Sequence, residues 1–258
     1  MEKRTPLIFF LCAIITFIAS SSFSQDVNIE PAKSVQRRQH ILDSLPAKNY
    51  PALSYPDNPA SGAIVWGAFL NVTIAPREVV RDQVRQLPQL IGLMRIGLPA
   101  NFGVAAKLAG NYIANEFSII PSWYYSYRNF SAAIQTSPAL WFGAADFTGF
   151  STFGMGFANA PAVNLGFKFD DFLLSAKVEF ITNYWQYIKF GTDVVKRSVT
   201  EFEGEAVTLS IEQDAFGGAR INWGMRLNYT RPDYQLWLAF SDSRLRTLTP
   251  EFFFGMVL

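Results

Sequence analysis

The sequence predicts an all-β fold, a transmembrane antiparallel up-and-down β-barrel of about 12 strands, with about 10 to 14 possible, preceded by a short N-terminal arm. Three observations predict it. Apolar and polar residues alternate along many segments, the chain has few charged residues, and aromatic residues gather toward the ends of the alternating segments.

The alternation is clearest in residues 220–229, RINWGMRLNY. Successive side chains of a strand point to opposite faces, so a period of two gives one apolar face and one polar face, whereas a helix would mix the two sets. We expect this segment to be a strand. Its apolar set is Ile221, Trp223, Met225, Leu227 and Tyr229, and its polar set is Arg220, Asn222, Gly224, Arg226 and Asn228.

Composition indicates which medium the apolar faces meet. Only 17% of the residues are charged and 50% are hydrophobic, against a usual charged share of roughly 25%. A soluble β-sandwich or lipocalin-like barrel with so few charges would have a poorly soluble outer face, whereas an outer face in lipid tolerates this composition. Aromatic clusters at strand ends favour lipid too. They are Trp123–Tyr125 with Tyr127, Tyr184 with Trp185 and Tyr187, and Tyr229 with Tyr234 and Trp237.

The first 24 residues have the layout of a secretory signal peptide. Lys3 and Arg4 precede the apolar run 7–19, and small residues follow up to Ser24. Cys12, the only cysteine, has no lipobox before it, so the mature chain would contain no cysteine and no disulfide. Its formal net charge would be zero, and nothing indicates a nucleic-acid partner.

Residues 25–61 are expected to form a periplasmic leader arm or linker. SVQRRQHILDSL can make a short helix, and the four prolines at 46, 51, 56 and 59 disfavour regular structure after it. This arm is a candidate plug or periplasmic tether. The barrel is predicted to follow over residues 62–258.

Within the barrel, alternation predicts strands in order, beginning with residues 64–74. Residues 77–89 carry too many charges for a strand, and we expect a short helix or a long loop there. Further alternating segments occupy 104–112, 116–128, 165–170, 177–180, 207–212 and 220–229. Breakers at 99–101, 159–161, 216–218 and 231–233 are expected to be hairpins or loops. With roughly 10 residues per strand and about 5 per connection, this length gives about a dozen strands.

The chain ends in EFFFGMVL, where Phe252, Phe254, Met256 and Leu258 alternate. An exported chain with such a terminal strand resembles the outer-membrane β-barrel proteins of Gram-negative bacteria. The resemblance covers residues 62–258 and identifies no subfamily, and Leu258 departs from the terminal Phe usual in these proteins. It implies an outer-membrane location, lipid as the surrounding medium, and recognition of the last strand by the barrel assembly machinery.

No motif indicates catalysis, a metal site or a cofactor. The single histidine, His40, precedes the barrel, so a Ser/His hydrolase site on the barrel lacks its base. Asp170, Asp171 and Asp242 are the carboxylates that an aspartyl-type site would use, but adjacent carboxylates at a turn are usually solvated. Glu201, Glu203 and Glu205 suggest a calcium-attracting loop no more strongly than any acidic loop does.

The polar faces supply the candidate functional residues, which would point into the lumen. They carry both signs of charge. This mixture is expected of a selectivity ring in a conducting pore, and also of an ion-pair network that fills a narrow lumen. The candidates are Lys107, Glu116, Arg128, Lys168, Lys177, Glu179, Lys189, Glu212, Arg220 and Arg226.

These features favour a non-enzymatic, porin-like channel or transporter for small or hydrophobic solutes, one variant of which would release hydrophobic solutes sideways into the bilayer. The alternatives are a structural barrel that anchors a periplasmic or surface protein partner, and a lipid-modifying enzyme, against which the missing barrel histidine counts.

Overall fold

The computed structural model describes residues 52–74, 86–111, 114–147, 150–215, 219–231 and 246–257. These residues form strands and short connections, and residues 50–258 make up one compact unit. No helix in the described part of the chain is long and apolar enough to cross a membrane.

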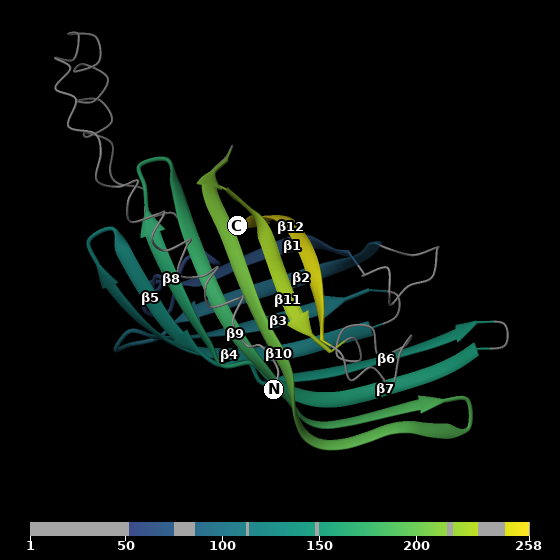
Figure 1. Ribbon diagram of the computed structural model, residues 1–258. Coiled ribbons are helices and arrows are strands. Elements are labelled where there is room, and N and C mark those ends of the chain that lie inside the picture. The colour runs from purple at the N-terminus through teal and green to yellow at the C-terminus, as the bar shows by residue number, and fades with distance from the viewer. Residues whose placement is uncertain are drawn as a thin grey trace, which may run out of the picture. The chain divides into compact units, whose positions relative to one another are not determined.

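Twelve strand segments pair in antiparallel fashion (Figure 1). Their bounds are β1 Ile64–Ile74, β2 Gln86–Gly97, β3 Phe102–Gly110, β4 Ala114–Tyr127, β5 Phe130–Gln135, β6 Ala139–Phe147, β7 Phe150–Asn159, β8 Ala162–Lys168, β9 Phe172–Phe190, β10 Asp193–Asp214, β11 Arg220–Thr230 and β12 Thr247–Val257.

The sheet closes on itself as a barrel. Each segment pairs with the next along the chain, except β5 with β6 and β7 with β8, and β1 pairs with β12. Segments β5 and β6 lie end to end against β4, and β8 and β7 lie end to end against β9. Two long strands are therefore each interrupted once, near Pro138 and Pro161, and the twelve segments occupy ten positions around the barrel. The predicted fold class is confirmed.

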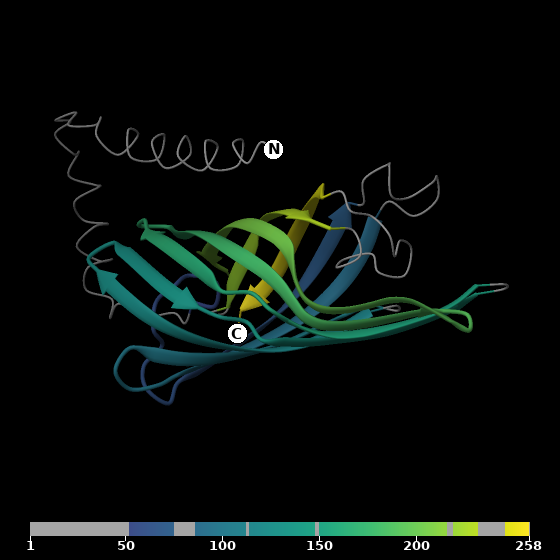
Figure 2. The same ribbon diagram turned by 60° about the horizontal axis from the view of Figure 1, so that its bottom comes forward.

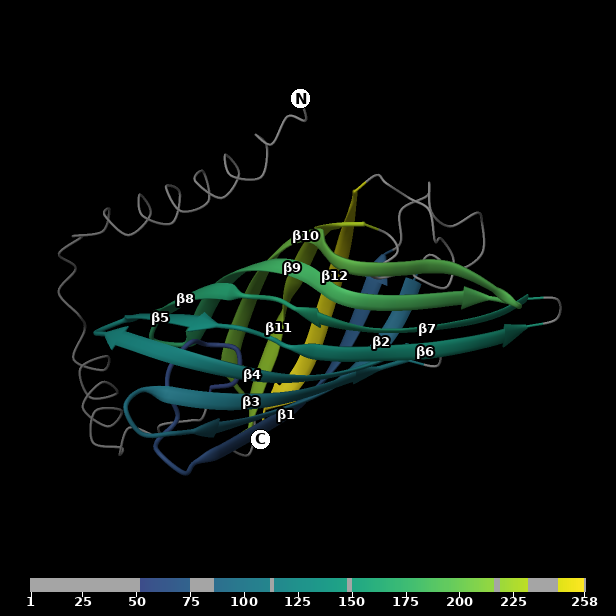
Figure 3. The same cartoon turned by 90° about the horizontal axis from the view of Figure 1, so that it is seen from below.

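The two ends of the barrel differ. At the end where β1 begins and β12 ends, which we call the terminal end, the connections include the short segments 98–101, 128–129 and 169–171, and of the residues between β10 and β11 only 215 and 219 are described. At the opposite end, the loop end, β6, β7, β9 and β10 continue past the other strands (Figures 2 and 3). The connections 75–85 and 232–245 at the loop end lie outside the described residues.

The barrel has an apolar outside and a polar inside. Along β1, Ile64, Trp66 and Leu70 are exposed, whereas Phe69 and Asn71 are buried. The same alternation runs along β11, where Trp223 and Tyr229 are exposed and Asn222 and Asn228 are fully buried. Buried polar side chains occur on most strands around the lumen, including Ser118, Ser131, Asn164, Ser175, Glu179, Ser210, Glu212 and Glu251.

Three expectations for local structure were wrong or incomplete. Residues 159–161 do not reverse the chain: Pro161 cannot donate a backbone hydrogen bond, so it interrupts the strand between β7 and β8, which both run antiparallel to β9, without making a turn. Residues 201–205 lie within β10 and not in a loop. Residues 86–89 belong to β2, and the rest of the segment 77–89 lies outside the described residues.

Candidate functional site: the lumen and its plug

The segment 52–56 lies inside the terminal end of the barrel, and we call it the plug. Leu53 is 5% exposed and packs with Val65, Phe69 and Val257. Tyr55 is 4% exposed. A chain that crosses the lumen must satisfy its own backbone polar groups there, because water is largely excluded.

Glu212 of β10 satisfies three of these groups. Its carboxylate accepts hydrogen bonds from the backbone N–H of Leu53 at 3.1 Å, of Tyr55 at 3.2 Å, and of Ser54 between them. The Glu212 side chain is almost fully buried, so its charge would be costly without these donors. Hydrogen bonds to a charged acceptor are roughly twice as strong as neutral ones, so this carboxylate is the main polar anchor of the plug.

Other strands hold the plug's oxygen atoms. Arg95 of β2 donates from Nη1 to the carbonyl oxygen of Tyr55 at 2.9 Å, and its guanidinium lies over the Tyr124 ring, 4.5 Å from the centroid. Asn164 of β8 donates to the carbonyl oxygen of Ser54 at 3.0 Å, and Asn222 of β11 donates to the Ser54 hydroxyl. Strands on opposite sides of the lumen therefore form hydrogen bonds with the same few residues of the plug.

Glycines in the wall make room for the plug. A Cβ at Gly166 would lie 2.5 Å from the Tyr55 ring and 2.6 Å from the Pro56 ring. At Gly67 it would lie 2.8 Å from a Leu53 methyl carbon. The wall thus lacks side chains at positions where the plug passes.

The phenol of Tyr55 reflects this enclosure. Burial raises its pKa above the usual value, a hydrogen bond with Ser131 opposes the shift, and the charge of Asp57 adds to it. The hydroxyl therefore stays protonated at neutral pH.

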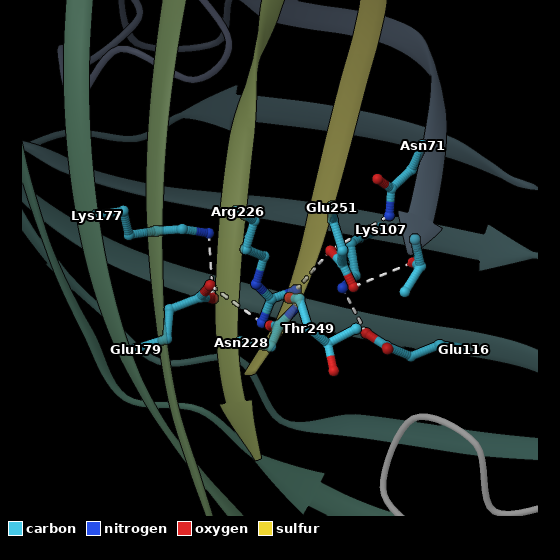
Figure 4. Close-up of polar contacts among 10 residues, drawn as sticks. Asn71, Lys107, Glu116, Lys177, Glu179, Arg226, Asn228, Thr249 and Glu251 are labelled. Carbon is cyan, nitrogen blue, oxygen red and sulfur yellow. Dashed lines mark hydrogen bonds and ion pairs between the residues drawn. The ribbon is translucent and has the colours of Figure 1, made fainter. Parts of the chain in front are cut away.

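Beyond the plug, toward the loop end, the lumen contains a charged chamber (Figure 4). Glu179 of β9 lies between two cations, 3.1 Å from Lys177 Nζ and 3.3 Å from Arg226 Nη2. The other terminal nitrogen of Arg226 is 3.9 Å from Glu251, which also accepts hydrogen bonds at 3.3 Å from Asn71 and Thr73. A separate ion pair joins Lys107 of β3 to Glu116 of β4.

These six charged residues, three of each sign, line a cavity of about 270 Å³ that reaches Ser54 of the plug. Trp141, Phe69 and Phe253 also line it, so the chamber combines charged, amide and aromatic surfaces. A smaller cavity of about 110 Å³ lies against the plug itself.

The candidate residues from the sequence lie in three places. Lys107, Glu116, Lys177, Glu179 and Arg226 gather in the chamber, and Glu212 holds the plug.

The remaining four lie away from the chamber. Arg220 pairs with Asp214 at 2.9 Å near the terminal end, Arg128 lies in the β4–β5 turn beside the Tyr127 ring, and Lys168 is exposed at the end of β8. In β9 the pairing with β7 skips Tyr184, and this bulge reverses the alternation. Lys189 therefore shares a face with the exposed Trp185 and not with the buried Gln186.

Sequence reasoning missed Arg95, Glu251, Asn71 and Asn164 as functional side chains. Alternation contained a signal for two of them. The apolar set Phe252, Phe254 and Met256 places Glu251 on the inward face, and the set 64–74 places Asn71 there. Nothing in the sequence pointed to the contact between Glu212 and residues 53–55, which are more than 150 positions away.

Within the described ranges, no three His, Cys, Asp or Glu side chains are grouped so that they could hold a metal ion. Asp170 and Asp171 lie exposed in the β8–β9 turn. His40 and Asp242 lie outside the described residues.

No protein-family model matches this sequence, and no curated protein matches it. Among solved structures, the barrel is similar to the KdgM porin in complex with disordered oligogalacturonate, at 9% identity and a TM-score of 0.37, over 75% of this chain and 97% of that one. It is also similar to the translocator domain of the autotransporter NalP from Neisseria meningitidis, at 9% and 0.42, over 87% and 94%. An outer membrane channel from Pseudomonas putida F1 gives 7% and 0.33, over 83% and 100%.

All three TM-scores lie below 0.5, so these likenesses assign no family and no function. The strand pairing and the distribution of polar residues define the class of protein instead: a closed β-barrel of the transmembrane type, with a charged lumen and an internal plug.

Proposed function

We propose that this protein is a non-enzymatic outer-membrane channel or transporter for small solutes, whose lumen is closed at rest by its own plug. The observation that carries the proposal is the polarity of the closed barrel. Large apolar side chains cover the outside, and buried charged and amide side chains fill the inside.

The outer face suits a bilayer. In hydrocarbon every backbone polar group needs a protein partner, and a closed antiparallel barrel meets this requirement. Exposed side chains such as Leu90, Leu108 and Ile134 would be unfavourable in water and favourable in lipid.

The two ends suggest an orientation. Outer-membrane barrels have short periplasmic turns and longer extracellular loops, and both ends of this barrel's chain lie at the end with short turns. The terminal end, with the plug, then faces the periplasm. An exported precursor with residues 1–24 as a cleaved signal peptide fits this location, as does recognition of β12 by the assembly machinery.

The lumen suits passage of polar solutes. The six charged side chains of the chamber form ion pairs, and a passing ion or zwitterion can replace one partner of such a pair. The plug blocks the terminal end of the lumen. Opening therefore requires residues 52–56 to leave Glu212, Arg95, Asn164 and Asn222.

The test is ion conductance of the signal-free protein refolded into planar bilayers. We compare wild type with Gly166→Leu, whose side chain collides with Tyr55 and Pro56. The matched control is Gly92→Leu, because a Cβ at Gly92 meets no atom within 4 Å. We expect wild type and Gly92→Leu to be closed for most of the recording, and Gly166→Leu to conduct steadily.

Folding of each variant is checked by the heat-dependent change in gel mobility of barrels. A folded but silent Gly166→Leu protein would contradict the channel proposal, and would favour the alternative that the barrel anchors a periplasmic or surface partner.

A further inference from the structure

Three prolines lie at one level on neighbouring strands of the barrel wall. They are Pro121 in β4, Pro138 between β5 and β6, and Pro161 between β7 and β8. Their carbonyl oxygens accept hydrogen bonds from Thr136 at 3.2 Å, Ile119 at 3.2 Å and Phe180 at 2.9 Å respectively. Proline has no N–H, so the return bond of each pair cannot form. The ladder is thus weakened at this level at two strand interfaces, twice between β4 and the strand that contains β5 and β6, and once between the strand that contains β7 and β8 and its neighbour β9.

A polar pair lies in this part of the outer face. Thr136 donates from Oγ1 to Asn159 Oδ1 at 2.7 Å, and both half-buried residues continue the outward-facing sets that contain Ile134 and Met155. Large exposed apolar side chains flank the pair along both strands, namely Ile134, Leu140, Met155 and Val163. Polar side chains facing hydrocarbon are rare and usually functional.

Small side chains line the inner face of the wall at the same place. The side chains that point inward behind the pair are small: Ser118, Ser137, Ala139, Ala158 and Ala162. Gln135 and Ser137 line the charged chamber directly. Apart from Gln135 and Ile120, the inward side chains at this level are small, and a weakened ladder separates the chamber from the lipid.

We propose that this stretch of wall, which we call the proline window (Pro121, 136–138 and 159–161), is a lateral portal between the chamber and the bilayer for single-chain zwitterionic amphiphiles. The proposal rests on the proposed function, because it gives the chamber an exit while the plug closes the axial path. A zwitterionic headgroup can pair with Glu179 and Glu251 through its cation and with Lys177 and Arg226 through its anion. Thr136 and Asn159 offer hydrogen bonds to the headgroup on its way through the wall.

The experiment is photo-crosslinking of the signal-free protein in phospholipid vesicles. The probe is a single-chain phosphocholine amphiphile that carries a diazirine in its headgroup, and labelled residues are located by mass spectrometry. We expect label on chamber residues of β9 and β11 around Lys177 and Arg226. A Thr136→Cys/Asn159→Cys variant, oxidised to a disulfide across the window, should lose this chamber label and regain it on reduction.

The control is Leu70→Cys/Phe254→Cys, a directly paired and outward-facing couple on β1 and β12, away from the window. Its disulfide should leave chamber labelling unchanged. Chamber labelling that persists in the oxidised window variant would show axial entry and overturn the proposal, as would label confined to lipid-facing residues. Disulfide-linked dimers of Asn159→Cys alone at low protein-to-lipid ratio would overturn it too, because the polar pair would then lie against a second copy.

This readout needs no ionic current. A silent Gly166→Leu channel with window-dependent labelling would contradict the channel and retain the portal. A conducting channel with no window-dependent labelling would retain the channel proposal and contradict the portal.

Discussion

At the scale of single residues, the lumen is organised by carboxylates that each bind several partners. Glu179 lies between Lys177 and Arg226. Glu251 accepts hydrogen bonds from Asn71 and Thr73 and lies 3.9 Å from Arg226, and Glu212 accepts hydrogen bonds from the plug. Removing one partner of a buried ion pair leaves the other charge uncompensated, which costs more than the pair itself contributes. The chamber charges should therefore determine which ions pass.

This predicts a change in ion selectivity when one chamber charge is removed. In the conducting Gly166→Leu background, Arg226→Gln leaves Glu179 and Glu251 with less positive charge nearby, so the preference for cations should rise. Two charges a few ångströms apart interact by about 1 kcal/mol or more, which corresponds to a several-fold change in permeability ratio. Glu179→Gln should shift the ratio the opposite way.

The measurement is the reversal potential in a KCl gradient. The control is Arg220→Gln, because Arg220 pairs with Asp214 near the terminal end and not in the chamber. Equal reversal potentials in Arg226→Gln, Glu179→Gln and their parent would show that ions do not pass these residues.

At the scale of elements, alternation within each strand determines which side chains face lipid and which face the lumen. Two adjacent residues of β2 illustrate this. Leu90 is 69% exposed, and its neighbour Gln89 lines the chamber. In a bilayer these two adjacent positions face different media, whereas a soluble barrel would place Leu90 in water.

Leu90→Arg should therefore lower the free energy of unfolding in vesicles by about 2–4 kcal/mol, the cost of Arg on the lipid face near the bilayer midplane. Gln89→Arg, on the polar inner face, should cost much less. Guanidinium titrations of both variants in the same vesicles measure the difference. Equal stabilities would contradict a lipid-facing position for Leu90.

Alternation also determines which strand faces could be predicted from the sequence alone. Strands such as β1 and β11 could be predicted with their faces, because their period of two is unbroken. Faces beyond a bulge could not: one extra residue at Tyr184 reverses every later side chain of β9, including Lys189. The interruption at Pro161 was predicted to be a turn, because proline marks a broken ladder whether or not the chain reverses, and the interruption at Pro138 was not predicted.

At the scale of the whole molecule, the barrel encloses a segment of its own chain. The sequence makes the proline-containing arm 25–61 a candidate plug or tether, and it does not show which of its residues enter the lumen. That contact depends on tertiary structure. Leu53 of the plug packs against β1, and the plug backbone forms hydrogen bonds with Arg95 of β2, Asn164 of β8 and Glu212 of β10. Local pattern has no signal for such a contact.

The central claim is that this plug fills the lumen at rest, and thiol labelling tests it most directly. In signal-free protein, which lacks Cys12, we introduce Leu53→Cys in the buried plug or Ser61→Cys in the exposed segment after it. Each variant is refolded into vesicles and treated with a membrane-impermeant maleimide. We predict that Leu53→Cys reacts at least about tenfold more slowly than Ser61→Cys, since labelling of a buried thiol must wait for local opening.

Adding Gly166→Leu or Glu212→Gln should remove most of this protection, and adding Gly92→Leu should not. Equal labelling rates for Leu53→Cys and Ser61→Cys in the folded barrel would contradict the account, because the lumen would then be open without any movement of the plug.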